Sequence, residues 1–329
     1  RDTKDMLGPG LDFPDMFGAS APQTNNARMR NRGWELSLNY RGKIGSDIDY
    51  SIGGSLSDAT AEVTEYANPT GTNPAGNWYE GRKVGEIWGY RASGIIQTQE
   101  EADEYNAKYN LSYLTGKAWE PGDVKYIDLN GDNKIDRGDN NLNNMGDLTI
   151  IGNTTPRYQY TFNGSISYKD LSLSMMFQGV AKRDWDPGTA PYFWGSGAYA
   201  QVTVFNEHMD YWREDNKDAY YPKPYIHSAG GVGPFRNKTM QTSDRYLQSG
   251  AYCRLKNITL SYNLPSTWVQ KAGLQKVQVF FSGENLLTFT SLKGMFDPEA
   301  IFTSNSYTGE GGKNYPMNKV VSFGLVVNL

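Results

Sequence analysis

The sequence predicts an all-β protein, a transmembrane antiparallel β-barrel, and three observations support this prediction. Apolar and polar residues alternate in seven separate segments, and the connections between the segments are alternately short and long. The composition also favours strands and turns, because the 329 residues include 36 Gly, 23 Tyr, 13 Phe and 8 Trp.

The alternation is clear at 34–40, where Trp34, Leu36 and Leu38 are separated by polar residues. Residues two apart in a strand lie on the same face, so such a segment predicts one apolar and one polar face. The other segments with this pattern are 48–56, 158–168, 171–177, 258–264, 277–281 and 321–329. Tight connections at 42–47, 169–170 and 265–275 predict three hairpins.

Three long connections separate the predicted hairpins, at about 58–156, 181–250 and 286–319. Transmembrane barrels have short periplasmic turns and long extracellular loops, so we expect these three segments outside the cell. The last strand, from 320 onward, would then run inward and end at the periplasmic rim. The strand-like segment 84–98 is expected within the first long loop, because one more crossing would invert every later turn.

A soluble β-sandwich is the alternative, because its strands also alternate between a core face and a water face. The polar face of the predicted strands is mostly Ser, Asn, Thr, Gln and Gly with few Lys or Glu, which favours a barrel lumen. Single-chain bacterial barrels have even strand numbers from about eight upward. Seven strands therefore predict that 1–329 is the C-terminal part of a barrel, with more strands before Arg1.

The composition also argues against several classes of function. The net charge is −4 and Lys and Arg form no cluster, so we expect no nucleic-acid partner. Cys253 is expected to be a packing residue, and His208 and His227 stand too far apart to suggest a metal site or a catalytic triad. No apolar run reaches the roughly 18 residues of a transmembrane helix, but barrel strands are only half apolar. We predict no enzyme activity.

The segment 128–139 predicts a calcium site. Side-chain oxygens stand at positions 1, 3, 5, 9 and 12, and position 7 would offer its backbone carbonyl, as in an EF-hand loop. The predicted ligands are Asp128, Asn130, Asp132, Lys134, Asp136 and Asp139. Asn133 replaces the usual Gly at position 6, where Asn is tolerated because it enters the left-handed region readily. A polar turn without metal is the alternative to this structural calcium clip.

The second long loop combines aromatic residues with carboxylates, and this combination predicts a substrate-binding surface. Aromatic faces can stack on sugar rings, and carboxylates can bind hydroxyl groups. The candidate residues are Trp185, Tyr192, Trp194, Tyr199 and Trp212. The alternative is that these side chains pack within the loop or against a neighbouring subunit.

Several segments resemble the SusC/RagA group of TonB-dependent transporters from Bacteroidetes. Residues 249–265 read SGAYCRLKNITLSYNLP, which is similar to the group's pattern G-x-Y-x-R-L-K-N-I-T-L-S-Y-x-L-P. Residues 283–290 (GENLLTFT) and 296–299 (FDPE) resemble its G-x-N-L-x-T-x-T and Y-D-P-E block. Smaller matches are Arg32–Glu35, Pro156–Tyr158 and Tyr315–Pro316. The matches occur in order along nearly the whole chain.

The resemblance implies the C-terminal part of an outer-membrane barrel of roughly 22 strands. It implies import of an oligomeric nutrient, with a glycan as the first choice and a peptide as the alternative. The expected partners are a SusD-like surface lipoprotein, the TonB–ExbB–ExbD complex acting through a plug outside this sequence, outer-membrane lipid and a second SusC–SusD pair. A secreted carbohydrate-binding β-sandwich is the alternative from another class.

Overall fold

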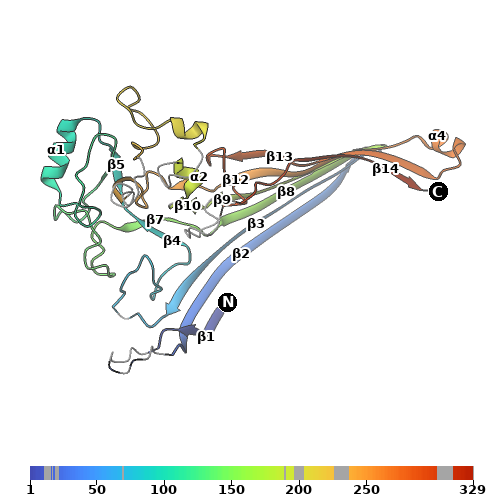
Figure 1. Ribbon diagram of the computed structural model, residues 1–329. Helices are drawn as coiled ribbons and strands as arrows, with labels where there is room; N and C mark the ends of the chain where they lie inside the picture. Colours follow the sequence, from blue (N-terminus) through green and yellow to red (C-terminus); the bar gives the residue numbers. More distant parts are fainter. Residues whose placement is uncertain are drawn as a thin grey trace.

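The main feature of the computed structural model is an antiparallel sheet of eight strands in the order β1-β2-β3-β8-β9-β12-β13-β14. The structure describes residues 1–10, 16, 18, 22–68, 70–188, 190–195, 204–225, 237–301 and 314–328. Figure 1 shows the eight strands side by side in a twisted, curved wall, with most of the remaining chain gathered at one end of it.

The strands of the wall are β1 (Asp2–Gly8), β2 (Thr24–Ile44), β3 (Ile48–Glu65), β8 (Arg157–Tyr168), β9 (Leu171–Lys182), β12 (Tyr252–Asn263), β13 (Lys276–Thr290) and β14 (Val320–Asn328). Three two-stranded sheets lie outside it, formed by β4 (Glu86–Gly89) with β7 (Thr149–Asn153), β5 (Ala92–Ile95) with β6 (Val124–Tyr126), and β10 (Asp184–Trp185) with β11 (Gln248–Ser249). The helices are α1 (Gln99–Lys108), α2 (Pro191–Trp194), the 3₁₀ helix η3 (Asn206–Met209) and α4 (Ser266–Lys271). None of the helices in the described residues is long and apolar enough to span a bilayer.

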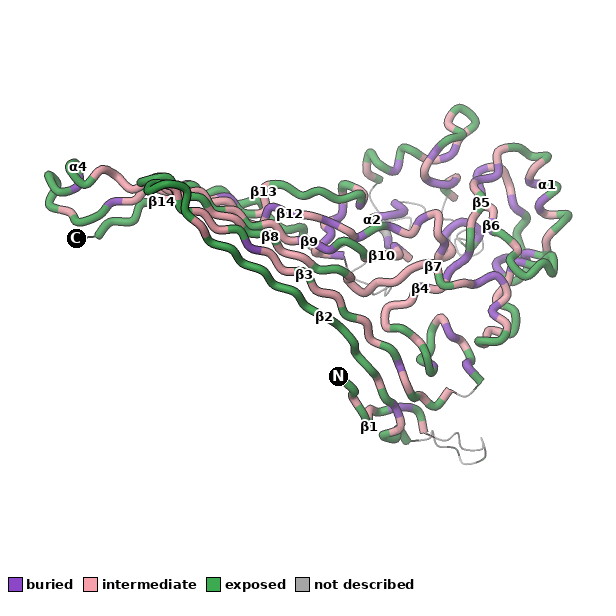
Figure 2. The backbone as a smooth tube through the Cα atoms, turned by 180° about the vertical axis from the view of Figure 1, so that it is seen from behind, coloured by how far each residue is buried: buried purple, intermediate pink, exposed green. Residues whose placement is uncertain are grey.

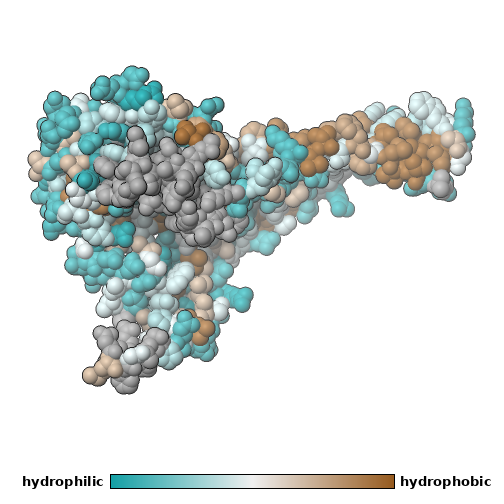
Figure 3. Space-filling model, viewed as in Figure 1, coloured by the Kyte–Doolittle hydropathy of each residue, from teal (hydrophilic) through white to brown (hydrophobic). Residues whose placement is uncertain are grey.

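The strand register places apolar side chains together on one face of the wall. One row of directly opposed residues crosses five strands and contains Ile166, Leu173, Leu260, Phe281 and Phe323. Directly opposed residues share a face, so this row is continuous across the sheet. Its members are not covered by protein, because Ile166 is 46% and Phe323 is 80% exposed. Figure 3 shows apolar residues gathered along the wall, whereas the visible described surface at the other end is mainly hydrophilic.

The opposite face of the wall is polar. A row of hydroxyl side chains crosses six strands, at Ser51, Ser165, Ser174, Thr259, Ser282 and Ser322. The Ser51 and Ser165 hydroxyls lie 2.7 Å apart, within hydrogen-bond distance. An uncovered apolar face combined with a polar face of small hydroxyl residues is the pattern of a membrane barrel wall, and not of a water-soluble sandwich whose apolar face is covered.

Three aromatic rings lie across glycines on the neighbouring strand. A Cβ atom at Gly324 would come within 2.2 Å of Phe280 Cζ, and one at Gly179 within 2.4 Å of Tyr160. In the third case, a Cβ at Gly42 would come within 2.7 Å of Tyr50 Cζ. Each glycine therefore leaves the space in which the opposed ring lies, a device that also stabilises a strand weakened by glycine.

The predicted fold class is confirmed, with differences in strand number and length. All seven predicted strands are present, and β1 is an additional one that pairs with the beginning of β2. Eight is an even number, so the odd strand count no longer supports the expectation of further strands before Arg1. Most strands also extend beyond the alternating segments, as β2 does from 24 to 44.

The long connections pack together into one unit, which we call the loop layer and define as the described parts of 66–156, 183–251 and 291–319. It holds the predicted strand-like segment 84–98, whose β4 and β5 pair with β7 and β6 and not with the wall, as expected. Most of the buried hydrophobic side chains of the described chain lie here. Figure 2 shows the same contrast, with buried segments concentrated in the loop layer and the wall mostly exposed or intermediate.

Candidate ligand-binding region in the loop layer

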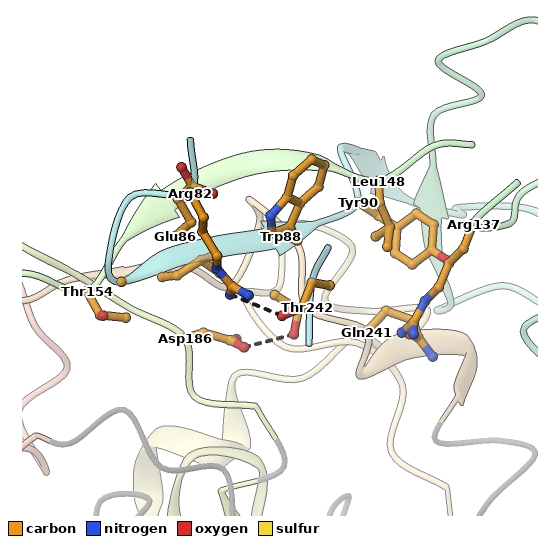
Figure 4. A pocket seen from close by; sticks show the side chains of 13 residues that line it. Arg82, Glu86, Trp88, Tyr90, Arg137, Leu148, Thr154, Asp186, Gln241 and Thr242 are labelled. Atoms are coloured by element: carbon orange, nitrogen blue, oxygen red, sulfur yellow. Dashed lines mark hydrogen bonds between the residues drawn. The ribbon is translucent and has the colours of Figure 1, made fainter. Parts of the chain in front are cut away.

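A cavity of about 340 Å³ lies in the loop layer between β4 and the segment 241–242. Hydrogen bonds hold these two segments side by side, because Tyr90 N donates to Thr242 O at 2.9 Å. The rest of the lining includes Arg82, Arg137 and Asp186, which follows β10. Figure 4 shows Arg82 extending toward Thr242 and Asp186, whereas Arg137 approaches beside Tyr90 and Gln241 on another side of the cavity.

Both carboxylates that line the cavity accept hydrogen bonds from the protein. Thr242 Oγ1 donates to Asp186 Oδ2 at 2.8 Å, and Gly188 N donates to Asp186 Oδ1 at 3.1 Å. Burial raises the pKa of Asp186, and these two hydrogen bonds offset part of the rise. The Glu86 carboxylate accepts from Tyr79 Oη at 2.7 Å and from Lys83 N at 3.0 Å.

Four polar atoms of the lining, in contrast, are buried and make no hydrogen bond within the described residues. They are Arg82 Nε, Trp88 Nε1, Tyr90 Oη and Arg137 Nε. Tyr90 Oη interacts with the neighbouring Arg137, and Trp88 Nε1 with the Tyr79 hydroxyl, so three of the four have a polar neighbour but no hydrogen bond of normal geometry. Buried polar groups in folded proteins nearly always have a partner, so this concentration of unpaired N–H and O–H groups marks the cavity as a candidate binding site.

The predicted calcium segment 128–139 is a series of tight turns in which side-chain oxygens accept backbone N–H groups. Asp128 accepts from Gly131 N at 2.6 Å and from Asn133 N at 2.9 Å. Asp132 and Asp136 each accept from the backbone N–H two residues further on. Asn133 has a φ of 59°, the left-handed conformation that the EF-hand comparison requires at this position.

The segment is anchored by Ile135, which is fully buried in the core of the loop layer. A further carboxylate that the prediction did not include, Asp147, accepts from Leu129 N at 2.7 Å and from Asp136 N at 3.0 Å. Within the described residues, no three His, Cys, Asp or Glu side chains lie close enough together to hold a metal ion. Calcium binding stays a prediction.

Three of the five candidate substrate residues are buried in the loop layer. Trp185, Trp194 and Trp212 are 1%, 8% and 7% exposed. The ring of Trp185 packs 4.9 Å from that of Phe296, and the indole N–H groups of Trp194 and Trp212 donate to Gly188 O and Gln97 Oε1. These contacts favour the packing alternative for the three tryptophans. Tyr192 is 38% exposed, and Tyr199 lies outside the described residues.

Comparison with known proteins gives relatives along the whole chain, although no protein-family model matches it. TonB-dependent receptor P3 of Formosa agariphila is 28% identical over 342 residues, which cover 98% of this chain and 31% of the relative. TonB-dependent receptor P26 of the same organism is 24% identical over 342 residues, which cover 99% of this chain and 32% of that relative. Among solved structures, the RagAB peptide transporter matches 100% of this chain and 32% of its own, with a TM-score of 0.64 and 24% identity.

The chain is thus similar to TonB-dependent receptors along nearly its whole length. The suspected resemblance is thereby confirmed, in both sequence and fold. The chain spans about a third of the length of these relatives. The fold agrees with the RagAB peptide importer in its 'open-open' state as well, at a TM-score of 0.66 and 21% identity.

Two of the segments that carry the resemblance meet in a buried ion cluster. Arg254 on β12 donates to both oxygens of Asp297 at 2.8 Å and lies 3.1 Å from Glu299. Lys256 donates to Glu299 at 3.0 Å. Arg254 is 3% and Asp297 is 7% exposed. Because Asp297 also accepts from Met317 N at 3.0 Å, the cluster fastens both ends of the β13–β14 connection to the wall.

Sequence reasoning also missed a second buried ion pair, between Asp123 and Lys238, which are both fully buried. Lys238 Nζ lies 2.8 Å from Asp123 Oδ2, and Tyr225 Oη donates to Asp123 Oδ1 at 2.5 Å. Burial raises the pKa of the Asp123 carboxyl, and the Lys238 ammonium offsets part of this rise. These residues lie more than one hundred positions apart, so no local pattern could have revealed the pair.

Proposed function

We propose that the whole protein imports an oligomeric nutrient across the outer membrane in a TonB-dependent manner. The observation that carries this proposal is the eight-stranded wall with a bare apolar face, which resembles TonB-dependent receptors over the full chain. The apolar face would contact outer-membrane lipid, and the polar face would line the lumen. The energy would come from the TonB–ExbB–ExbD complex, acting through a part of the protein outside this sequence. We propose no enzyme activity.

The loop layer would lie on the extracellular side, because barrels have their long connections there and their short turns in the periplasm. A SusD-like lipoprotein would cover this layer, as the pairing in the name RagAB suggests for the neighbouring structures. Two such pairs would form a dimer. Purification of the tagged receptor from outer membranes, followed by mass spectrometry, tests the pairing, and a receptor recovered without a lipoprotein would contradict it.

The cargo is proposed to be a glycan, with a peptide as the alternative. Burial of Trp185, Trp194 and Trp212 removes much of the support that the aromatic residues gave to a glycan. The neighbouring RagAB structures are named for a peptide transporter and favour the alternative. The choice therefore has to come from growth experiments.

Growth of a gene-deletion strain on single nutrients tests both the import and its cargo. We expect the deletion to abolish growth on one glycan or one peptide mixture, while growth on glucose or free amino acids is unchanged. The intact gene should restore growth. Equal growth of the deletion and parent strains on every oligomer tested would contradict import, and a receptor soluble without detergent would contradict the barrel.

We also propose that the segment 128–139 binds calcium as a structural clip. The support is the spacing of its oxygen side chains, the left-handed Asn133 and the buried Ile135 that anchors the segment. We expect a dissociation constant on the order of 0.1–1 mM, as in extracellular calcium modules. Titration calorimetry should show calcium uptake by the parent protein and weaker uptake by Asp128→Ala and by Asp132→Ala. The exposed control Asp218→Ala should take up calcium like the parent. Equal behaviour of the parent and all three variants would contradict a calcium site in this segment.

A further inference from the structure

We infer that the cavity in the loop layer binds a carboxylate group of a ligand, with Arg137 as the anchor. The inference goes beyond import, because it names a site and a chemical group that it takes. Binding to the purified protein is measured separately from growth, so failure of one does not decide the other.

The lining of the cavity has an imbalance between hydrogen-bond donors and acceptors. Every carboxylate oxygen of Asp186 and Glu86 already accepts a hydrogen bond from the protein. The unpaired groups of the lining are N–H and O–H groups, which donate. The complementary ligand therefore has to supply acceptor oxygens, because a second set of donors would leave these groups unpaired.

A second feature of the lining is the isolation of Arg137. Its Nε atom is buried without a hydrogen bond, and no carboxylate forms an ion pair with its guanidinium within the described residues. Its identified neighbours are uncharged: the Tyr90 hydroxyl, with which it interacts, and the Tyr113 ring, whose centre lies 6.0 Å away. Arg82 differs, because its terminal nitrogens donate to the Asn77 and Ala75 carbonyls. Arg137 is thus the positively charged residue of the lining that is left to bind an anionic group of a ligand.

The chemistry of the guanidinium favours a carboxylate. A guanidinium presents N–H groups in a planar fork that matches the two oxygens of a carboxylate. Arg82 Nε and Trp88 Nε1 then remain for further oxygens of the same ligand. The volume of about 340 Å³ is near the lower limit of small-molecule pockets, so the cavity fits one end group and not a whole oligomer.

Two sources would supply such a group, an acidic sugar of a glycan and the carboxyl end of a peptide. Titration calorimetry on the whole receptor in detergent can separate them with four probes: glucuronate, glucose, alanylalanine and the amide of alanylalanine. We expect at least one of the two acids to bind, and its neutral counterpart to bind at least tenfold more weakly, because a charge-assisted hydrogen bond is lost. The acid that binds identifies the source.

The decisive variant is Arg137→Gln, which removes the charge and keeps a polar side chain. We expect it to weaken binding of the acid at least tenfold, and Arg137→Lys to retain part of the affinity. Arg213→Gln is the matched control, because Arg213 is an exposed arginine elsewhere in the loop layer that pairs with Asp215. It should bind like the parent.

The inference is overturned if neither acid binds the parent protein at millimolar concentration, or if Arg137→Gln binds the acid as tightly as Arg213→Gln does. It is also overturned if an acid and its neutral counterpart bind equally. Loss of folding in Arg137→Gln would show as a changed melting temperature. In that case the comparison of Arg137→Lys with the parent decides, because a folded lysine variant with no affinity loss would contradict the planar fork.

Discussion

Large apolar side chains are exposed in the wall and buried in the loop layer. In the wall, large apolar residues such as Leu38 and Phe323 are 67% and 80% exposed. In the loop layer, Trp119, Phe193 and Tyr246 are at most 1% exposed and belong to one aromatic core. The wall needs a surrounding lipid to bury its apolar face, whereas the loop layer folds like a water-soluble domain on top of it.

Charged residues follow the same division. The wall face that meets lipid has none in its central row, and the buried ion pairs lie in the loop layer or where it joins the wall, at Arg254–Asp297 and Asp123–Lys238. The stability of the wall therefore depends on the bilayer, whereas the stability of the loop layer depends on burial away from water. Single substitutions should be able to damage either region and leave the other intact.

The largest effect should come from breaking the cluster that joins the two regions. Arg254→Ala leaves Asp297 and Glu299 partly or fully buried without their shared guanidinium, which should cost about 3–5 kcal/mol. Urea unfolding followed by tryptophan fluorescence in detergent measures this loss. In Arg213→Ala the lost ion pair is exposed, so this control should change stability by about 0–1 kcal/mol. A similar loss in both variants would refute a special role for the cluster.

A loss of similar size is expected in the loop-layer core. Phe193 is fully buried among Trp194, Tyr246 and Phe296, and Phe193→Ala should cost about 3–5 kcal/mol in the same assay. Phe289→Ala is the control in the wall, where the side chain is 61% exposed to detergent or lipid. The comparison between regions fails if the two alanine variants lose equal stability.

The lipid-facing role of the wall can be tested on two adjacent residues of β2. Leu38 belongs to the apolar face and Asn39 to the polar face. Leu38→Arg should destabilise the barrel in lipid vesicles by about 2–4 kcal/mol, the usual cost of a cation near the bilayer midplane. Asn39→Arg should be tolerated, because this side chain would point into the lumen. Reversal of the two results would mean that the faces are assigned the wrong way round.

The smallest expected effect is a dependence of the loop layer on acid. Burial raises the pKa of Asp297, but hydrogen bonds from Glu299 N and Arg254 outweigh this and lower it overall. A lowered folded pKa gives stability that is present above the unfolded value of about 3.9 and is lost as the pH falls through the folded value. Unfolding measured between neutral and acid pH should show a smaller acid loss in Asp297→Asn. An identical pH profile would exclude Asp297 as a contributor.

The sequence predicted the wall well only where its two faces meet different surroundings. From 34 to 40 the alternation is complete, because one face is apolar and the other polar. Nearer the loop layer β2 continues through Arg28 and Arg30, which pair with Glu65 on β3 and Asp2 on β1. Both faces there can meet water, so the pattern of period two disappears. Strand β1 could not be predicted for the same reason, since its residues DTKDMLG show no alternation of apolar and polar side chains.

The candidate sites could be predicted only in part. The turns of 128–139 follow from local spacing, because each carboxylate binds an N–H group two to five residues away. The cavity could not be found in this way, since Arg82, Arg137 and Asp186 are separated by about fifty residues each and no local pattern links them. The resemblance marked Arg254 and Asp297 as motif residues, but their contact depends on how the β13–β14 connection folds back.

The aromatic rings that lie over glycines have a consequence for how the wall assembles. A slip of one residue between β13 and β14 would exchange the two faces, and the bilayer would oppose it. A slip of two residues keeps the faces and escapes that penalty. It would move Phe280 from Gly324 to Ser322 or Val326, where a side chain occupies the space of the ring. Tyr160 over Gly179 and Tyr50 over Gly42 act in the same way, so three glycines serve as alignment marks for strands that the bilayer alone could not align.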